Sequence, residues 1–304
     1  MTAATQLVWG TDYVESSVEF DCGGERLLGI LSRPAADGHV ACGVLIIVGG
    51  PQYRVGSHRQ FVLLARRLAA AGIATFRFDY RGMGDSSGAL RSFENVDEDV
   101  AAALDAFERA CPGLQRITLW GLCDAASVAL LYWQKTRDAR VAGLCLLNPW
   151  VRSEATLARA HVKHYYGQRL LQAEFWRKLL RGDMNLLGAL GGLLKSVHLW
   201  LGAEEGGEGS AVQQPFQSRM ALALREFSGP VLLILSGDDY TAKEFIECAD
   251  ADAPWAGVLG QGNILRRDFP RADHTFSDIA CRIEAESATL EWLQSAVESK
   301  CDVS

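Results

Sequence analysis

The sequence predicts an α/β fold with a mostly parallel, twisted sheet and helices on both faces. Apolar runs rich in Val and Ile alternate with helical patterns, as βαβ units require. A strand, a tight turn of small residues and a helix follow one another at residues 117–127. A long stretch rich in Leu and Trp then breaks the alternation, and its length fits an inserted subdomain better than a connecting loop.

The N-terminal part of the chain contains four predicted strands. Residues 17–22 alternate as a half-buried strand, Gly23 and Gly24 form a hairpin turn, and residues 27–32 form the partner strand. Residues 40–48 and 74–78 are continuous apolar runs, which suit strands buried on both faces of a sheet. A helix is expected between these two runs.

The rest of the core continues the alternation. A helix with one apolar face is expected at residues 93–107, and a buried strand at residues 141–147. Later in the chain, strands at 231–236 and 263–269 precede a closing helix at 280–298. This order predicts that most strands run parallel, because each is joined to the next through a helix.

Residues 148–227 form the predicted insertion. They contain three of the eight Trp residues, much Leu and a flexible Gly-rich stretch from Gly202 to Ser210. We expect a helical cap here, and an α/β core formed by residues 1–147 and 228–304.

Composition excludes several classes of function. The chain has 304 residues, a net charge of −7 and no basic face, so nucleic acid is not an expected partner. Its eight Cys residues show neither a CxxC pair nor metal-ligand spacing, which indicates unpaired thiols in a reducing compartment. The N-terminus lacks a signal-peptide pattern, and no apolar run approaches the ~18 residues of a membrane span. We therefore expect a cytoplasmic protein.

The stretch around Cys123 carries the predicted chemistry. Gly121, Cys123 and Ala125 give the pattern small–x–nucleophile–x–small between an apolar strand and a helix. A strained turn of this kind lifts the nucleophile above the sheet, and small neighbours are needed because strand and helix lie close on either side. The helix N-terminus and a nearby His would favour thiolate over thiol at Cys123. The alternative is a small buried Cys in a core turn.

A nucleophilic thiol needs a base, and the base needs an orienting acid. His274 is the one His that follows the strand at 231–236, and it stands on a loop after the last predicted strand. Asp239 best fits the acid position just beyond the strand at 231–236, with Asp238 as the alternative. The alternative is that either carboxylate merely caps the helix that follows.

Acyl transfer further requires donors for an oxyanion. We expect the backbone N–H of Asp124, directly after the nucleophile, as one donor and that of Gln52 as the other, because Pro51 has no N–H to give. The Asp124 carboxylate would oppose an oxyanion, so we expect it to point away and serve the helix N-terminus. Arg54 and His58 flank this loop and are candidate substrate contacts.

Four motifs together resemble the α/β-hydrolase superfamily. They are GLCDAAS at 121–127, DYRGMGDS at 79–86, GGPQYR at 49–54 and DHTF at 273–276. More narrowly, they resemble the exosortase-A-system-associated hydrolases of the first type. This resemblance implies a bacterial, cytoplasmic protein linked to exopolysaccharide and surface-protein sorting. The chain departs from the superfamily in having Cys where Ser usually stands, which keeps an acyl-enzyme route open, as in dienelactone-type hydrolases.

The sequence as a whole predicts an α/β-hydrolase fold and a hydrolase that cleaves an ester or thioester through a cysteine acyl-enzyme. Cys123 would attack, His274 would shuttle the proton and Asp239 would hold the imidazole. The expected substrate is a small-molecule acyl compound shaped by the cap, with no cofactor, no metal and no membrane span. Two alternatives stay open: an acyltransferase with the same triad, and a non-catalytic binding or scaffold protein on the same fold.

Overall fold

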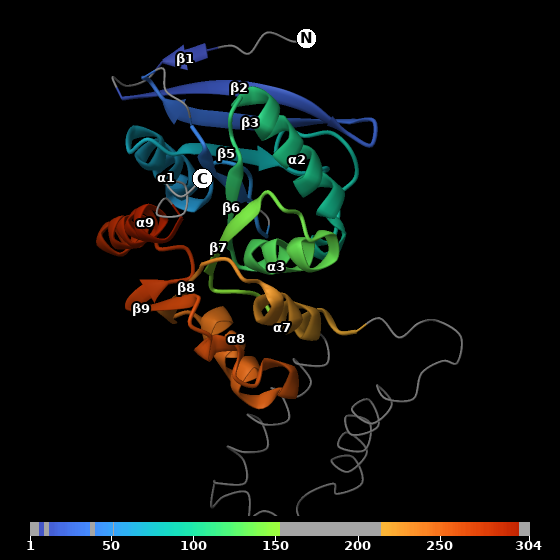
Figure 1. The fold of residues 1–304 in the computed structure, drawn as a ribbon, viewed down its shortest axis with the longest axis vertical. Coiled ribbons are helices and arrows are strands. Elements are labelled where there is room, and N and C mark those ends of the chain that lie inside the picture. Colours follow the sequence, from blue (N-terminus) through green and yellow to red (C-terminus); the bar gives the residue numbers. More distant parts are fainter. Residues whose placement is uncertain (1–5, 9–11, 37–39, 51, 153–213, 298–304) are drawn as a thin grey trace, which may run out of the picture. The chain divides into compact units, whose positions relative to one another are not determined.

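A nine-stranded sheet runs through the described part of the chain, which comprises residues 6–8, 12–36, 40–50, 52–152 and 214–297 of the computed structural model (Figure 1). The strands are β1 (Gln6–Val8), β2 (Tyr13–Cys22), β3 (Glu25–Pro34), β4 (Cys42–Ile47), β5 (Ala74–Asp79), β6 (Arg116–Leu122), β7 (Val141–Leu147), β8 (Val231–Asp238) and β9 (Ile264–Asp273). Their order in the sheet is β1-β2-β3-β5-β4-β6-β7-β8-β9. Strands β4 to β9 pair in parallel with one another, whereas β1, β2 and β3 pair antiparallel with their neighbours. The predicted mostly parallel sheet is confirmed.

Helices cover both faces of this sheet. The α-helices of the described residues are α1 (Gln60–Ala70), α2 (Asp97–Ala110), α3 (Asp124–Thr136), α7 (Phe216–Glu226), α8 (Tyr240–Ala251) and α9 (Ile279–Trp292). Helix α1 packs beside α9, while α3 contacts both α2 and α7 (Figure 1). Because each parallel crossover passes through a helix, the loops that follow β4, β6, β8 and β9 meet at one edge of the sheet.

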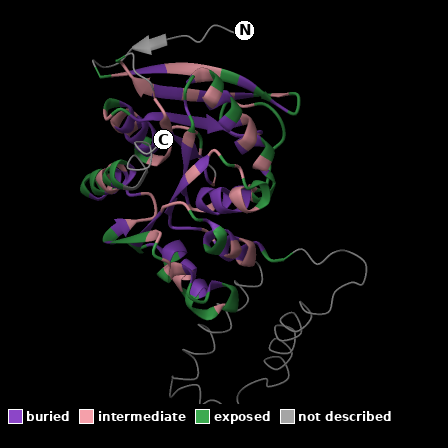
Figure 2. Cartoon of the chain, in the orientation of Figure 1, coloured by how far each residue is buried: buried purple, intermediate pink, exposed green. Residues whose placement is uncertain are grey.

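The core lies at the centre of the sheet. Every residue of β5 is buried, and β4 is buried from Gly43 onward (Figure 2). The rings of Phe76 and Phe107 lie 5.6 Å apart and join β5 to α2. Each fully buried Leu, Ile, Val or Phe side chain stabilises the fold by about 1.5–3 kcal/mol. The central strands are therefore the rigid base from which the loops at the carboxyl edge project.

The predicted strands are confirmed, with some ends displaced. Strands β2 and β3 pair antiparallel across a turn at Gly23 and Gly24, both of which have positive φ. Strand β9 continues to Asp273, past the predicted end at Phe269, so the following residue, His274, stands directly at the carboxyl edge. The extension occurs because β8 still pairs with β9 at Asp238 and Asp273, beyond a bulge.

The second compact unit of the chain begins later and ends earlier than the predicted insertion at residues 148–227. The chain divides into one compact unit of residues 1–151 and 214–304 and a second of residues 152–213. Helix α7 was expected in the cap, but it belongs to the first unit because Phe216, Met220 and Leu224 are buried there. Residues 153–213, including the Gly202–Ser210 stretch, lie outside the described residues, so the helical cap stays a prediction.

Candidate active site

The turn between β6 and α3 holds Cys123 in a strained backbone conformation. Its φ of 65° and ψ of −128° are rare for a residue that is not glycine. The Cys123 N–H donates to the Leu147 carbonyl at 2.9 Å, and the Cys123 carbonyl accepts from the N–H groups of Ala126 and Trp150 at 3.1 and 3.2 Å. These bonds tie the turn to the neighbouring strand and to the loop after β7, which is how the fold maintains the strain.

Small residues around this turn are required by contact. A Cβ added to Gly121 would lie 2.4 Å from the carbonyl carbon of Ala125, and Ala125 itself is fully buried. Helix α3 therefore packs directly on the end of β6. The small–x–nucleophile–x–small spacing has the steric cause that the sequence suggested.

Three side chains meet at the carboxyl edge of the sheet. His274 Nδ1 lies 2.8 Å from Asp239 Oδ2. The His274 side chain also forms a hydrogen bond with the Cys123 thiol. Asp239 is buried, and its second oxygen, Oδ1, accepts the Thr241 N–H at 2.9 Å and so caps α8. Asp238, the alternative acid, is exposed. Asp239 thus serves as helix cap and as partner of His274 at once, with one oxygen for each.

The charge on His274 follows from these contacts. Hydrogen bonds to Asp239 and to the Cys123 thiol raise the pKa of His274 from 6.5 to about 10, although partial burial opposes the shift. The imidazole is therefore protonated at neutral pH, facing Asp239 on one side and the sulfur on the other. A cationic imidazole beside a thiol stabilises the thiolate, which is the nucleophilic form.

Asn148 holds the loop that carries His274, and it was not among the predicted site residues. It follows β7, is fully buried and has a φ of 44°. Its side-chain oxygen accepts the Ser236 N–H at 2.8 Å, and its Nδ2 donates to Ser236 Oγ at 2.9 Å and to the His274 carbonyl at 3.4 Å. One amide therefore links the ends of β7 and β8 to the loop that carries His274. Its position as a polar residue directly after a buried strand is the sequence feature that would have identified it.

The loop after β4 is held by a buried carboxylate. Asp79 at the end of β5 accepts the Arg54 N–H at 2.6 Å and the Asp85 N–H at 3.1 Å, and it forms an ion pair with the Arg54 guanidinium. Arg54 also pairs with Asp85 at 2.5 Å. Two carboxylates therefore pair with the Arg54 guanidinium, and its contact with substrate stays a prediction. The DYRGMGDS motif acts as an anchor for this loop.

The other residues of this loop have separate positions. The half-buried Gln52 accepts the Ser57 N–H through its side-chain oxygen at 3.1 Å, which fixes the loop, while its backbone N–H as an oxyanion donor stays a prediction. His58 is exposed with a φ of 52°. Burial opposes the shift, but hydrogen bonds from Ser277 and Thr275, together with the proximity of His58, lower the pKa of Asp273. His58 therefore lies near the loop that carries His274, and its contact with substrate also stays a prediction.

The Asp124 carboxyl group faces the loop after β4. A Cβ added to Gly49 would lie 2.3 Å from Asp124 Oδ1. The backbone amides of Asp124 and Ala125 also face the carboxyl group, which retains the expected role at the helix N-terminus. Burial raises the pKa of this carboxyl, opposed by the nearby amides and by the charge of His274.

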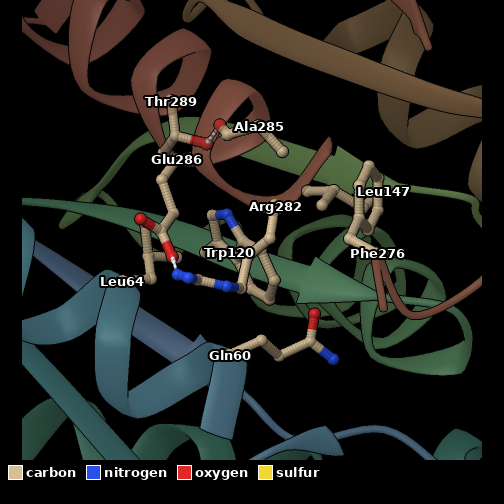
Figure 3. A pocket seen from close by; sticks show the side chains of 9 residues that line it. All are labelled: Gln60, Leu64, Trp120, Leu147, Phe276, Arg282, Ala285, Glu286 and Thr289. Atoms are coloured by element: carbon tan, nitrogen blue, oxygen red, sulfur yellow. Dashed lines mark hydrogen bonds and ion pairs between the residues drawn. The ribbon is translucent and has the colours of Figure 1, made fainter. Parts of the chain in front are cut away.

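A small cavity lies behind the site, between α1, β6 and α9 (Figure 3). It has a volume of about 20 Å³, and Leu147 and Phe276 in its wall also neighbour Cys123 and His274. Gln60 Nε2 and Trp120 Nε1 are buried there without a partner among the described residues. The cavity is large enough for about one water molecule and contains none of the three triad side chains.

Comparisons with known proteins concern the fold. Residues 41–183, less than half of the chain, match the profile of a family described as Serine aminopeptidase, S33. The fold is similar to a cold-adapted esterase from an Arctic intertidal metagenomic library (TM-score 0.58, 17% identity, 95% of this chain and 96% of that chain). It is also similar to a hypothetical protein of Pseudomonas aeruginosa (TM-score 0.61, 18% identity, 95% and 96% covered) and to Est1E of Butyrivibrio proteoclasticus with bound ferulic acid (TM-score 0.59, 16% identity, 92% and 99% covered). A search of the curated proteins finds no match.

These findings establish the fold. The predicted α/β-hydrolase fold is confirmed by the sheet and by structures that match nearly the whole chain. The profile match and the structural similarities support the α/β-hydrolase superfamily. No helix among the described residues is long and apolar enough to cross a membrane. Within the same residues, no group of three or more His, Cys, Asp or Glu side chains could hold a metal ion.

Proposed function

We propose that this chain is a hydrolase that cleaves a small-molecule ester or thioester through an acyl-enzyme on Cys123. The observation that carries the proposal is the connected set of Cys123, His274 and Asp239, with Cys123 in a strained turn and a 2.8 Å contact between the other two. Similarity in fold to proteins named as esterases supports the reaction class. The Cys at the nucleophile position supports a thioester intermediate.

The proposed reaction has two halves. The Cys123 thiolate attacks the acyl carbon, a C–S bond forms, and the carbonyl electron pair moves onto oxygen. When the pair returns, the bond to the leaving group breaks and the leaving group takes the proton from the His274 imidazolium. A water molecule then attacks the thioester while His274 accepts its proton, and the C–S bond breaks to release the acid and restore the thiolate–imidazolium pair.

Asp239 and Asn148 act on His274 in this scheme. The Asp239 carboxylate stabilises the imidazolium and fixes which ring nitrogen faces it, so the second ring nitrogen is left for Cys123. Asn148 fixes the backbone of the loop through the His274 carbonyl. The loop after β4, anchored by Asp79, would supply the second oxyanion donor from Gln52, and the first would come from the Asp124 N–H.

We also propose the narrower assignment to the exosortase-associated hydrolases and a cytoplasmic location. The motifs at 49–54, 79–86, 121–127 and 273–276 support this assignment. It would link the protein to exopolysaccharide and surface-protein sorting systems.

Product release from a panel of acyl esters and thioesters tests the proposal. Wild type should release the leaving group, and Cys123→Ala should not, with unchanged circular dichroism. Addition of alcohols or amines distinguishes hydrolysis from acyl transfer, because a transferase forms the new ester or amide in preference to the free acid. Equal turnover by wild type and Cys123→Ala would contradict the proposal and favour the scaffold alternative.

A further inference from the structure

The Asp124 carboxyl group faces one of the two expected oxyanion donors, its own backbone N–H. Asp124 opens α3 directly after Cys123, and its Oδ1 lies against Gly49 on the loop after β4. The backbone amides of Gly50, Asp124 and Ala125 face the same carboxyl group. Donors suited to an anionic oxygen therefore surround a carboxylate that belongs to the protein itself.

Oδ1 of this carboxyl is buried and accepts no hydrogen bond from the described residues. It packs tightly against the loop after β4, because a Cβ on Gly49 would lie 2.3 Å from it. An unpaired buried oxygen carries a free-energy cost. Such an arrangement in an otherwise hydrogen-bonded turn requires an explanation, and a functional constraint is one.

We propose that the Asp124 carboxylate competes with the oxyanion for the same site, so that acylation of Cys123 is fast only when this carboxylate is neutral. The inference rests on the proposed acyl-enzyme function. Attack by Cys123 places a negative charge on the former carbonyl oxygen, which the Asp124 N–H is expected to bind, and a second negative charge facing the same N–H repels it. A proton on Asp124 removes the repulsion and turns the carboxyl into a hydrogen-bond donor.

Other titratable groups face Asp124 as well. His274, from the loop after β9, opposes protonation of Asp124 through its positive charge. Tyr80, from the loop after β5, is held neutral because burial and the charge of Asp124 raise its pKa. Cys123 precedes Asp124 in the chain. Since all these groups shape the pH profile of any one variant, the ratio of rates between Asp124→Asn and wild type isolates Asp124.

The test measures the burst of 4-nitrophenol from 4-nitrophenyl acetate for wild type and Asp124→Asn across a wide pH range. Asn keeps the size of Asp and can donate a hydrogen bond, but it carries no charge. The variant should acylate at least about tenfold faster at about pH 8, and the ratio should fall to about one at acid pH where Asp124 is protonated. Asp238→Asn, which removes an exposed carboxylate, should give a ratio of about one at every pH.

A ratio near one at every pH would overturn the proposal, as would slower acylation by Asp124→Asn at every pH with wild-type thermal stability. If wild type and Cys123→Ala release 4-nitrophenol equally, the proposed function fails and alkylation of Cys123, followed by peptide mass spectrometry, tests Asp124 alone. Iodoacetate is anionic and iodoacetamide is neutral, so Asp124→Asn should raise the iodoacetate rate relative to the iodoacetamide rate. An unchanged relative rate would overturn the proposal on that route.

Discussion

The Asp239→Asn variant isolates the contact that orients His274. Asp239 Oδ2 lies 2.8 Å from His274 Nδ1, and Oδ1 accepts the Thr241 N–H at 2.9 Å. Asn is as good a helix N-cap as Asp, so the variant keeps the cap of α8. It replaces the oxygen that faces the imidazole with an NH2 group, which carries no charge and cannot accept a hydrogen bond from His274 Nδ1.

The expected loss of folding free energy is ~2 kcal/mol. Opposite unit charges about 4 Å apart attract by ~4 kcal/mol at an effective dielectric constant of about 20. The His274 side chain is 34% exposed, and fully exposed ion pairs contribute below about 1 kcal/mol, so about half of the Coulomb value is appropriate. The pKa of His274 is raised from 6.5 to about 10 in the folded protein. The stabilisation is therefore complete below pH 6.5 and is lost as the pH rises through about 10.

Urea unfolding at pH values below and above this window measures the effect. Asp239→Asn should lower the free energy of unfolding by ~2 kcal/mol at about pH 6 and by much less above about pH 10. Ester turnover at about pH 7 should fall by at least about 10²-fold, because the imidazole loses its charge partner and its fixed orientation. Asp238→Asn, with its exposed side chain, is the matched control and should change neither quantity. A loss of stability that is equal at both pH values, or a larger loss of turnover at Asp238, would refute the reasoning.

Three further substitutions test the elbow and its support. Cys123→Ser should lower ester turnover by at least about 10²-fold without changing the unfolding midpoint, since a hydroxyl needs stronger base assistance than a thiol. Gly121→Ala should destabilise the fold by about 1–3 kcal/mol in urea unfolding, because its Cβ would lie 2.4 Å from the Ala125 carbonyl carbon, whereas Gly262→Ala meets no atom within 4 Å and should not. Asn148→Ala should cost about 1–3 kcal/mol by leaving the buried Ser236 N–H without its acceptor, and it should lower kcat more than it changes KM. Wild-type kcat in a folded Asn148→Ala protein would show that Asn148 has no part in holding His274.

Local sequence patterns predicted the fold well because strand and helix periods are local properties. The continuous apolar runs at 40–48 and 141–147 became β4 and β7, and the small residues around Cys123 had the predicted steric cause. The ends of the insertion were displaced because the packing of α7 on α3 depends on contacts between residues far apart in the chain.

Side-chain partners within the site were harder to predict, because they depend on loops brought together by the sheet. Arg54 forms an ion pair with Asp79, which lies at the end of another strand, and no local pattern predicts this pair. Asp124 faces the Gly49 region because α3 begins close to the loop after β4, a distance that no local pattern encodes. Asn148 was missed because its partners, Ser236 and His274, are distant in sequence.

Intact-mass analysis after brief exposure to acyl thioesters and activated esters tests the acyl-enzyme most directly. Wild type should gain the mass of one acyl group, and peptide mapping should locate it on Cys123, next to the imidazole of His274. The Asp239→Asn variant should gain it more slowly, and Cys123→Ala should gain none. Unmodified wild-type protein across the panel, or acylation that persists in Cys123→Ala at the wild-type rate, would contradict the account.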